Sequence, residues 1–339
     1  GLGFVSLSQM YSLWHFSLSY AVIGVGMAAI GHVPSSAIVS NWFEKRRGTA
    51  IGIMATGIGA GGFVMAPIIG GFLIPNYDWS ISYLVLAVFT WVLIIPLALF
   101  VIRTKPADIG LYPDGRQTPE TAPATEAQPF TANGLSLRMA LATSGFWLAA
   151  VSYMTGGFSS VGIVQNQAPY LEDIGLPIAM VAGTLSGVGL GSLIGKFFFG
   201  WLCDRIPAKY AYSIALGLQT AGVIILMSVK PASPPLIIWL YVAAIGLGAG
   251  GWLPTMSILV STNFGLAAYG TIYGMVNLAQ SIGVATGPLL MGYIYDTMGT
   301  YQSAFIILLS LYAVAIPAML AVRRPKSPQN FRERTSKAG

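Results

Sequence analysis

The stretch that decides the fold is residues 187–209, GVGLGSLIGKFFFGWLCDRIPAK. It reads as the second half of an apolar helix that carries one charged residue, Lys196, and ends in the charged turn Asp204-Arg205. An ammonium group at the centre of a bilayer costs roughly 2.5–3.5 kcal/mol on insertion scales. The other long apolar segments contain no charged residue. Lys196 is therefore either close enough to the membrane surface to reach it, or present for a function.

The composition identifies the class of protein. Of the 339 residues 55% are hydrophobic and 8% are charged, against about 25% charged in soluble domains, which indicates an all-α integral membrane protein. The single cysteine and two histidines exclude a disulfide framework and a metal cluster built from them. Paired carboxylates and a nucleophile–base pair are missing from the predicted spans. We therefore expect neither an enzyme nor a bound metal or cofactor.

Nine segments reach the roughly 20 apolar residues that a spanning helix needs: 14–40, 49–75, 81–102, 146–168, 178–203, 210–229, 236–260, 271–294 and 303–322. The predicted domains are a helix bundle over 1–102, a polar linker over 103–143, a six-helix bundle over 144–322 and a basic tail over 323–339. Composition predicts that the linker is flexible.

The charge distribution predicts the orientation. When alternate loops are assigned to opposite sides, one side holds 15 of the 17 basic residues, and Lys230 alone lies on the other. By the positive-inside rule the linker and tail are cytoplasmic, in a multi-pass protein of the plasma (inner) membrane. The net charge of +6 thus reflects topology and contact with the lipid bilayer, and nucleic acid is not an expected partner.

An internal repeat extends the prediction. A shift of 222 residues superposes Gly48-Thr49 on Gly270-Thr271, with seven further identities over 47 positions. The spans from 14 to 102 then match the last three, and the chain begins without a methionine. We expect a whole of six plus six helices, of which the first two and most of the third precede residue 1.

Three motifs together resemble the major facilitator superfamily. They are GWLCDR (Gly200, Asp204, Arg205), GFVMAPIIGG (Gly62, Pro67, Gly70, Gly71) and KPADIGLYPDG at 105–115. Within that family, WFEKRRGTAIGI and the lysine before FFFGWLCDR look most like the monocarboxylate and oxalate–formate branch. The resemblance implies two six-helix bundles joined by a cytoplasmic linker, and transport by alternating access. This chain departs by having Ala66 where glycine is usual and Lys196 where that branch generally has arginine.

The motifs also have a physical reading. A carboxylate at Asp204 is stabilised by the positive N-terminal end of a neighbouring helix, and the span that opens at Gly270-Thr271 is the expected partner. Such a contact would hold the cytoplasmic side closed. The alternative is that Asp204 and Arg205 only cap a loop. Pro67, with Gly70 and Gly71, permits close helix crossing, and the resemblance implies a role of this pattern in exchange. Pro288 falls one residue out of register with Pro67 in the repeat.

Lys196 shares its helix face with Ser192, Gly189 and Gly200. Small polar faces look into a helix bundle, so we expect Lys196 to contact substrate; the alternative is that it snorkels to the surface. Further candidates for the substrate site are Tyr153, Asn166, Asn277, Gln280 and Trp252. His32 is a candidate for proton coupling. Each of these side chains is about as consistent with helix packing.

The sequence therefore predicts a monomeric secondary transporter for a small organic anion, a monocarboxylate or dicarboxylate, with Lys196 as its counter-charge. A proton or an exchanged anion is the expected second partner. The alternatives are efflux of apolar or cationic compounds, and a membrane sensor on the same fold.

Overall fold

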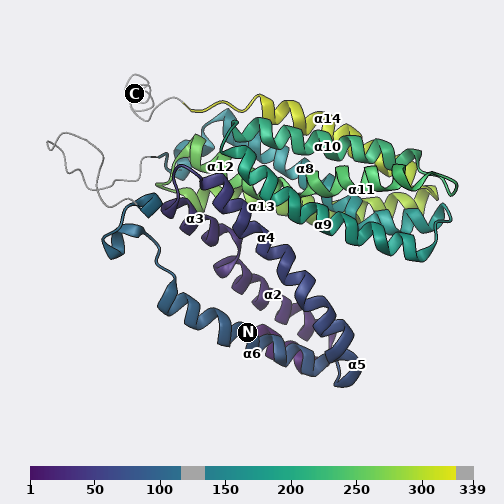
Figure 1. Ribbon diagram of the computed structural model, residues 1–339, viewed down its shortest axis with the longest axis horizontal. Coiled ribbons are helices and arrows are strands. Elements are labelled where there is room, and N and C mark those ends of the chain that lie inside the picture. The colour runs from purple at the N-terminus through teal and green to yellow at the C-terminus, as the bar shows by residue number, and fades with distance from the viewer. Residues whose placement is uncertain (116–133, 326–339) are drawn as a thin grey trace. The chain divides into compact units, whose positions relative to one another are not determined.

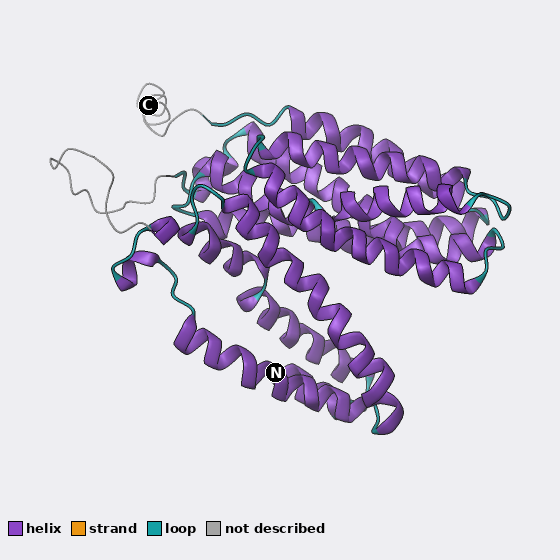
Figure 2. Cartoon of the chain, in the orientation of Figure 1, coloured by secondary structure: helices purple, strands orange, loops and turns teal. Residues whose placement is uncertain are grey.

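The computed structural model describes residues 1–115 and 134–325. Within these ranges the chain consists of helices and connecting loops, and its only β-type pairing is an isolated bridge between Gly134 and Gly265 (Figure 2). The all-α prediction is confirmed. Parts of the predicted linker (116–133) and tail (326–339) lie outside the described residues.

The chain divides into two compact units, Gly1–Glu44 with Gly57–Glu120, and Lys45–Thr56 with Thr121–Gly339. The start of α4 (Arg47–Ala66) thus packs with the second unit, and the rest of this helix belongs to the first. The predicted domain boundaries follow sequence composition and stay a prediction.

The first unit is built from long apolar helices and short irregular turns (Figure 1). Its elements are α1 (Leu2–Ser8), α2 (Leu13–Ile30), α3 (His32–Trp42), the remainder of α4, η1 (Pro67–Leu73), α5 (Ile74–Asn76), α6 (Trp79–Pro96), η2 (Leu97–Val101), η3 (Pro106–Ile109) and η4 (Pro113–Gly115). Pro67 has no amide hydrogen for the helical ladder, and the wide π-helical turns of η1 begin at this residue.

The first part of the predicted linker is docked on the unit. Trp42 Nε1 donates to the carbonyl of Arg103 at 2.8 Å, and Asn41 Nδ2 donates to that of Thr104 at 3.2 Å. The amide of Glu44 donates to Asp114 Oδ1 at 3.2 Å. Three residues of the predicted linker, Arg103, Thr104 and Asp114, are thus hydrogen-bonded to the end of α3 and to the residues just after it.

The second unit is a bundle of seven long or half-length helices with α7 (Leu137–Leu141) at one end. They are α8 (Ser144–Asp173), α9 (Ile178–Cys203), α10 (Ala208–Ser228), α11 (Pro235–Gly250), α12 (Trp252–Phe264), α13 (Tyr269–Met298) and α14 (Tyr301–Leu320). Glycines let α13 approach α8, since a Cβ at Gly283 or Gly287 would collide with the backbone of Met154 or Phe158. Small residues permit this close crossing in lipid.

Eight helices in the described ranges are long and apolar enough to cross a membrane: Leu13–Trp42, Arg47–Asn76, Trp79–Val101, Ser144–Asp173, Ile178–Cys203, Ala208–Ser228, Pro235–Phe264 and Tyr301–Leu320. The ninth predicted span, 271–294, is the helix α13, which is 30 residues long. It is missing from the eight because Asn277, Gln280 and Ser281 lower its hydropathy.

Two of the spans are broken where the sequence predicted continuous helices. The first break is at Gly31, between α2 and α3, and the second is at Gly251, between α11 and α12. In each case a proline, Pro34 or Pro254, follows two residues after the new helix begins. Proline fits the first turn of a helix, where its missing amide hydrogen costs little.

Candidate functional site

Asp204, the residue that ends α9, binds the first turn of α4. Asp204 Oδ1 accepts from the amide of Gly48 at 2.7 Å, and Oδ2 accepts from the amide of Thr49 at 2.8 Å and from Thr49 Oγ1 at 2.6 Å. The first amides of a helix have no partner within it, and they form its positive end. The carboxylate therefore caps α4 from a different helix, through three charge-assisted hydrogen bonds.

This contact corrects the expected partner. The sequence predicted the helix that opens at Gly270-Thr271, and the structure places the carboxylate on the equivalent pair of the repeat, Gly48-Thr49. Three basic residues, Lys45 to Arg47, precede Gly48. Their charge makes this helix start a better partner for a carboxylate than the loop before Gly270, which carries none.

Glycines bring α4 and α9 into backbone contact beside this cap. A Cβ built at Gly52 would lie 2.8 Å from the carbonyl oxygen of Lys196 and 3.1 Å from Gly200 Cα. A Cβ at Gly48 would collide with the carbonyl of Gly200. Since real Cβ atoms do not approach so closely, both positions of α4 require glycine, and Gly200 of the GWLCDR motif is the opposing surface.

Lys196 is buried beside this crossing, with 8% of its surface exposed. Its ammonium donates to Ser192 Oγ, one helical turn earlier, at 3.1 Å. An ammonium has three N–H donors, and Ser192 is its one hydrogen-bond partner among the described residues. On its other side, a Cβ at Gly250 would lie 2.5 Å from the Lys196 amide nitrogen. In this arrangement Lys196 lies in the interior and does not reach the surface.

The break between α11 and α12 brings further candidates to the same region. The hydroxyl of Thr255 donates to the carbonyl of Gly251 at 2.7 Å and lies 3.1 Å from that of Trp252. Tyr153 is fully buried, donates to Thr255 Oγ1 at 3.1 Å and stacks on Tyr212 with 4.2 Å between ring centroids. Gly250 packs against the backbone of Lys196, so the break lies beside α9 at Lys196, and Tyr153 reaches it through Thr255.

The remaining substrate candidates divide by their depth in the bundle. Gln280 is buried, and a Cβ at Gly157, one turn after Tyr153, would meet its Cγ at 2.9 Å. Asn277 is half-buried one turn earlier on α13. Asn166 Nδ2 donates to the carbonyl of Gly162 at 2.8 Å and lies near Met291. At 1.5 Å per residue it is about 20 Å along α8 from Tyr153, so the structure does not place it with the others.

The other predicted residues lie outside this cluster. Arg205 is exposed, with its guanidinium 3.7 Å from the Trp201 ring centroid, as in a loop-capping role. His32 is the half-buried first residue of α3, in the first unit. Gly62, Pro67, Gly70 and Gly71 are exposed, and a Cβ at any of these three glycines would have no described atom within 4 Å. Pro288 is half-buried within α13.

Several residues that the structure places in this region were not identified from the sequence. Thr49 and Gly52 emerged only as repeat identities, and Ser192 only as a neighbour of Lys196. Gly250 and Thr255 were not singled out, although a glycine pair followed by Trp-Leu-Pro-Thr indicates a helix break whose carbonyl needs a donor. In the described ranges, His, Cys, Asp and Glu residues form no group that could hold a metal ion.

Comparison with known proteins assigns the chain to one family. The model of the Major Facilitator Superfamily matches residues 1–285, and matches again over 167–338. The chain belongs to the major facilitator superfamily. The second, overlapping match agrees with the internal repeat.

Individual relatives have about a quarter of their residues in common with the chain. It is 26% identical over 317 residues to Monocarboxylate transporter 13 of Rattus norvegicus, covering 90% of the chain and 67% of that protein. It is 27% identical over 315 residues to Monocarboxylate transporter 11 of Homo sapiens, covering 90% and 63%. The chain thus spans about two thirds of the length of these curated relatives.

Solved structures support the same fold. The human organic anion transporter MFSD10 (TETRAN) superposes with a TM-score of 0.68 at 17% identity, covering 94% of the chain and 74% of that structure. A variant of the Escherichia coli fucose:proton symporter FucP superposes with a TM-score of 0.67 at 12% identity, covering 96% and 80%. At these identities the likeness shows the fold alone, and the predicted major facilitator fold is confirmed.

Proposed function

We propose that this chain carries out secondary active transport of a small organic anion, a monocarboxylate or dicarboxylate, by alternating access. Membership of the family supports transport, and the names of the relatives support a carboxylate. The proposal excludes catalysis of a chemical reaction. It places the protein in the plasma (inner) membrane, with the linker and the C-terminus cytoplasmic.

The state of Lys196 is the observation that carries the proposal. Its ammonium is buried among membrane-spanning helices and has one hydroxyl partner, Ser192, among the described residues. A buried charge without an opposite charge or a full set of acceptors is unfavourable. A carboxylate would supply that charge and two acceptor oxygens, so the site as built favours an anion.

The contact between Asp204 and α4 supplies a gate for this site. Gly52, one turn beyond the capped residues, lies against the backbone of Lys196. Separating α4 from α9 would therefore break the Asp204 hydrogen bonds and move α4 away from the backbone of Lys196 in a single movement. In our proposal the closed contact is one end state of the transport cycle, and its release gives access to the anion site.

Our candidates for further substrate contacts are Tyr153, Trp252, Gln280 and Asn277. The hydrogen bond from Tyr153 to Thr255 at the α11–α12 break supports Tyr153. The contact of Gln280, on α13, with Gly157, one turn after Tyr153 on α8, supports Gln280. Asn166 is excluded from this set by its depth. His32 stays the candidate for proton coupling, and loss of pH-dependent uptake in His32→Ala would test it.

The charge of Lys196 is tested by carboxylate-induced thermal stabilisation of the protein in detergent, with lactate and oxalate as probes. A charge-assisted hydrogen bond contributes about 1.5–3 kcal/mol, so Lys196→Gln should weaken binding by about 10–150-fold. Lys196→Arg, which keeps the charge, should retain most of it. Lys230→Gln, on an exposed loop, is the matched control and should bind like the wild type.

Two results would contradict the proposal. If Lys196→Gln is stabilised as strongly as the wild type, Lys196 is not the anion site, and efflux of apolar or cationic compounds becomes the better hypothesis. If neither carboxylate stabilises the wild type, transport of a small carboxylate itself is contradicted.

A further inference from the structure

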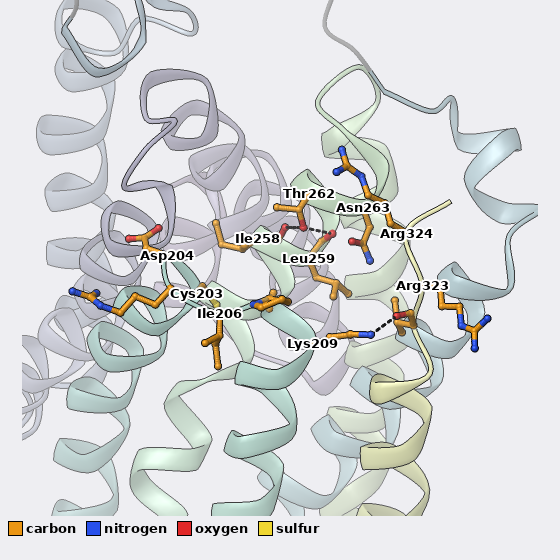
Figure 3. Close-up of a pocket in the computed structure, with 14 residues that line it drawn as sticks. Cys203, Asp204, Ile206, Lys209, Ile258, Leu259, Thr262, Asn263, Arg323 and Arg324 are labelled. Atoms are coloured by element: carbon orange, nitrogen blue, oxygen red, sulfur yellow. Dashed lines mark hydrogen bonds between the residues drawn. The ribbon is translucent and has the colours of Figure 1, made fainter. Parts of the chain in front are cut away.

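A pocket of about 600 Å³ opens at the end of the second unit, separate from the Lys196 region (Figure 3). It is formed where α9 ends and α10 begins, at the end of α12, and along the chain that follows α14. The size is that of a site for a small organic molecule or a headgroup.

The pocket is lined by four basic side chains: Arg205, Lys209, Arg323 and Arg324. Its one acidic residue, Asp204, already accepts three hydrogen bonds from Gly48 and Thr49. The lining therefore has a strong excess of positive charge.

Two of these cations already have a structural role. Lys209 Nζ donates to the carbonyl of Leu320 at 3.3 Å and to that of Val322 at 3.2 Å, the second of which is drawn in Figure 3, and so caps the end of α14. Arg205 lies on the ring of Trp201. Arg323 and Arg324 are exposed and form no hydrogen bond or ion pair with any described residue. Their guanidinium groups extend from the rim of the pocket in different directions (Figure 3).

The first turn of α10 adds uncharged donors. The helix begins at Ala208 after Pro207, and no side chain caps it. The amides of Tyr210 and Ala211 bond to the carbonyl of Pro207, and those of Ala208 and Lys209 have no acceptor among the described residues. Both of these residues line the pocket. Free amides at a helix start are suited to an anion.

The rest of the lining is apolar and includes Ile206, Ile258, Leu259 and Val322. A free inorganic anion makes no favourable contact with such an apolar surface, whereas the acyl chains of an amphiphile would bury it. The helices that end here are candidate membrane spans, so the pocket lies at the level where lipid headgroups meet the protein. We propose that this pocket binds the phosphate group of an anionic lipid, through Arg323, Arg324 and the start of α10.

The test is thermal stabilisation of the purified chain in neutral detergent by short-chain dihexanoyl phosphatidic acid. Dihexanoyl phosphatidylcholine, with the same acyl chains and no net charge, and inorganic phosphate are the comparison probes. Arg323→Gln/Arg324→Gln removes the two unpaired cations. Arg138→Gln/Lys230→Gln removes two exposed cations that do not line the pocket, and is the matched control.

We expect phosphatidic acid to stabilise the wild type and the control variant, with phosphatidylcholine giving little effect. The Arg323→Gln/Arg324→Gln variant should need about 30-fold more phosphatidic acid, because each basic residue contributes roughly one kcal/mol of attraction. Stabilisation by inorganic phosphate at the same concentrations would support the phosphate chemistry and overturn the lipid as its source.

Equal responses of the wild type and the Arg323→Gln/Arg324→Gln variant would overturn the proposal. So would equal losses in both double variants, since that result would indicate non-specific attraction. If the double variant does not fold, the single variants Arg323→Gln and Arg324→Gln are compared with Arg324→Lys, which should bind better than Arg324→Gln. This test does not depend on Lys196, so it can fail while the transport proposal stands.

Discussion

Asp204 supplies α4 with an acceptor that Arg46, the residue before the helix, lacks. The residues before the helix are Glu44, Lys45 and Arg46, and the first helical hydrogen bond runs from the amide of Ala50 to the carbonyl of Arg46. An arginine side chain has no acceptor atom, so Arg46 cannot cap the helix as Ser, Thr, Asp or Asn would. The capping energy therefore depends on α9 and is lost when the two helices separate.

Weakening this cap should loosen the end of α9 and so raise the reactivity of Cys203, the single cysteine of the chain, which precedes Asp204. We expect Asp204→Asn to label faster with a maleimide reagent than the wild type. Thr49→Val should do the same to a smaller degree, because it removes one hydrogen bond to a carboxylate, worth about 1.5–3 kcal/mol. The rate at which maleimide labels each purified variant, compared with the wild type, measures the effect of both substitutions.

Thr49→Val also serves as the control for charge. Removing the Asp204 carboxylate changes the electrostatics beside the thiol, whereas Thr49→Val leaves that carboxylate in place. If Asp204→Asn accelerates labelling and Thr49→Val does not, the effect comes from charge at the thiol, and the cap does not hold the helices together.

At the scale of helices, the α4–α9 crossing depends on the glycines of α4. Gly52→Ala should push α4 away from α9, because the added Cβ would lie 2.8 Å from the carbonyl oxygen of Lys196. We expect faster labelling of Cys203 and a lower melting temperature. Gly57→Ala is the matched control on the same helix, where a Cβ would meet no described atom within 4 Å.

The control variant should be neutral or slightly stabilising, since alanine favours a helix by about 1 kcal/mol over glycine. A Gly52→Ala protein that melts and labels like Gly57→Ala would show that the close crossing is not needed for the closed arrangement.

The length of the apolar segments predicted where the helices lie, but it did not predict where they are interrupted. An apolar segment has the same length and composition whether or not its helical hydrogen bonds are interrupted. The breaks at Gly31 and Gly251 were therefore not predicted. The repeat offered two equivalent partners for Asp204, Gly48-Thr49 and Gly270-Thr271. Both have the pattern Gly-Thr-x-x-Gly, so the choice depends on the charge beside each helix start and on how the helices pack, and the sequence pattern does not encode the packing.

For the site as a whole, the sequence predicted that the helix face of Lys196 points into the bundle, and it could not predict how deep each candidate residue lies along its helix. Lys196 was identified by its cost in a membrane, and the structure buries it, whereas its contact with substrate stays a prediction. Asn166 was grouped with Tyr153 because both are polar residues of one helix. Polarity alone does not distinguish positions about 20 Å apart on α8, and only the packing of α12 and α13 shows that Tyr153 faces the Thr255 hydroxyl.

The orientation of the molecule in the membrane follows from charge and is open to direct measurement. Basic residues are concentrated in the loops of one side, which predicts that this side is cytoplasmic. In a Cys203→Ser background, single cysteines are placed at Ala107, in the described part of the linker, and at Ala232, between α10 and α11; both native side chains are exposed. A membrane-impermeant maleimide should label Ala232→Cys in intact cells.

Ala107→Cys should react only after the cells are permeabilised. Both sites lie outside the predicted spans, so their reactivity reports the side of the membrane and not burial, and labelling in detergent confirms that each thiol is accessible. If Ala107→Cys reacts in intact cells and Ala232→Cys does not, the orientation is inverted. The contact between Asp204 and α4 would then close the outer side, and the phosphate pocket would face the outer leaflet.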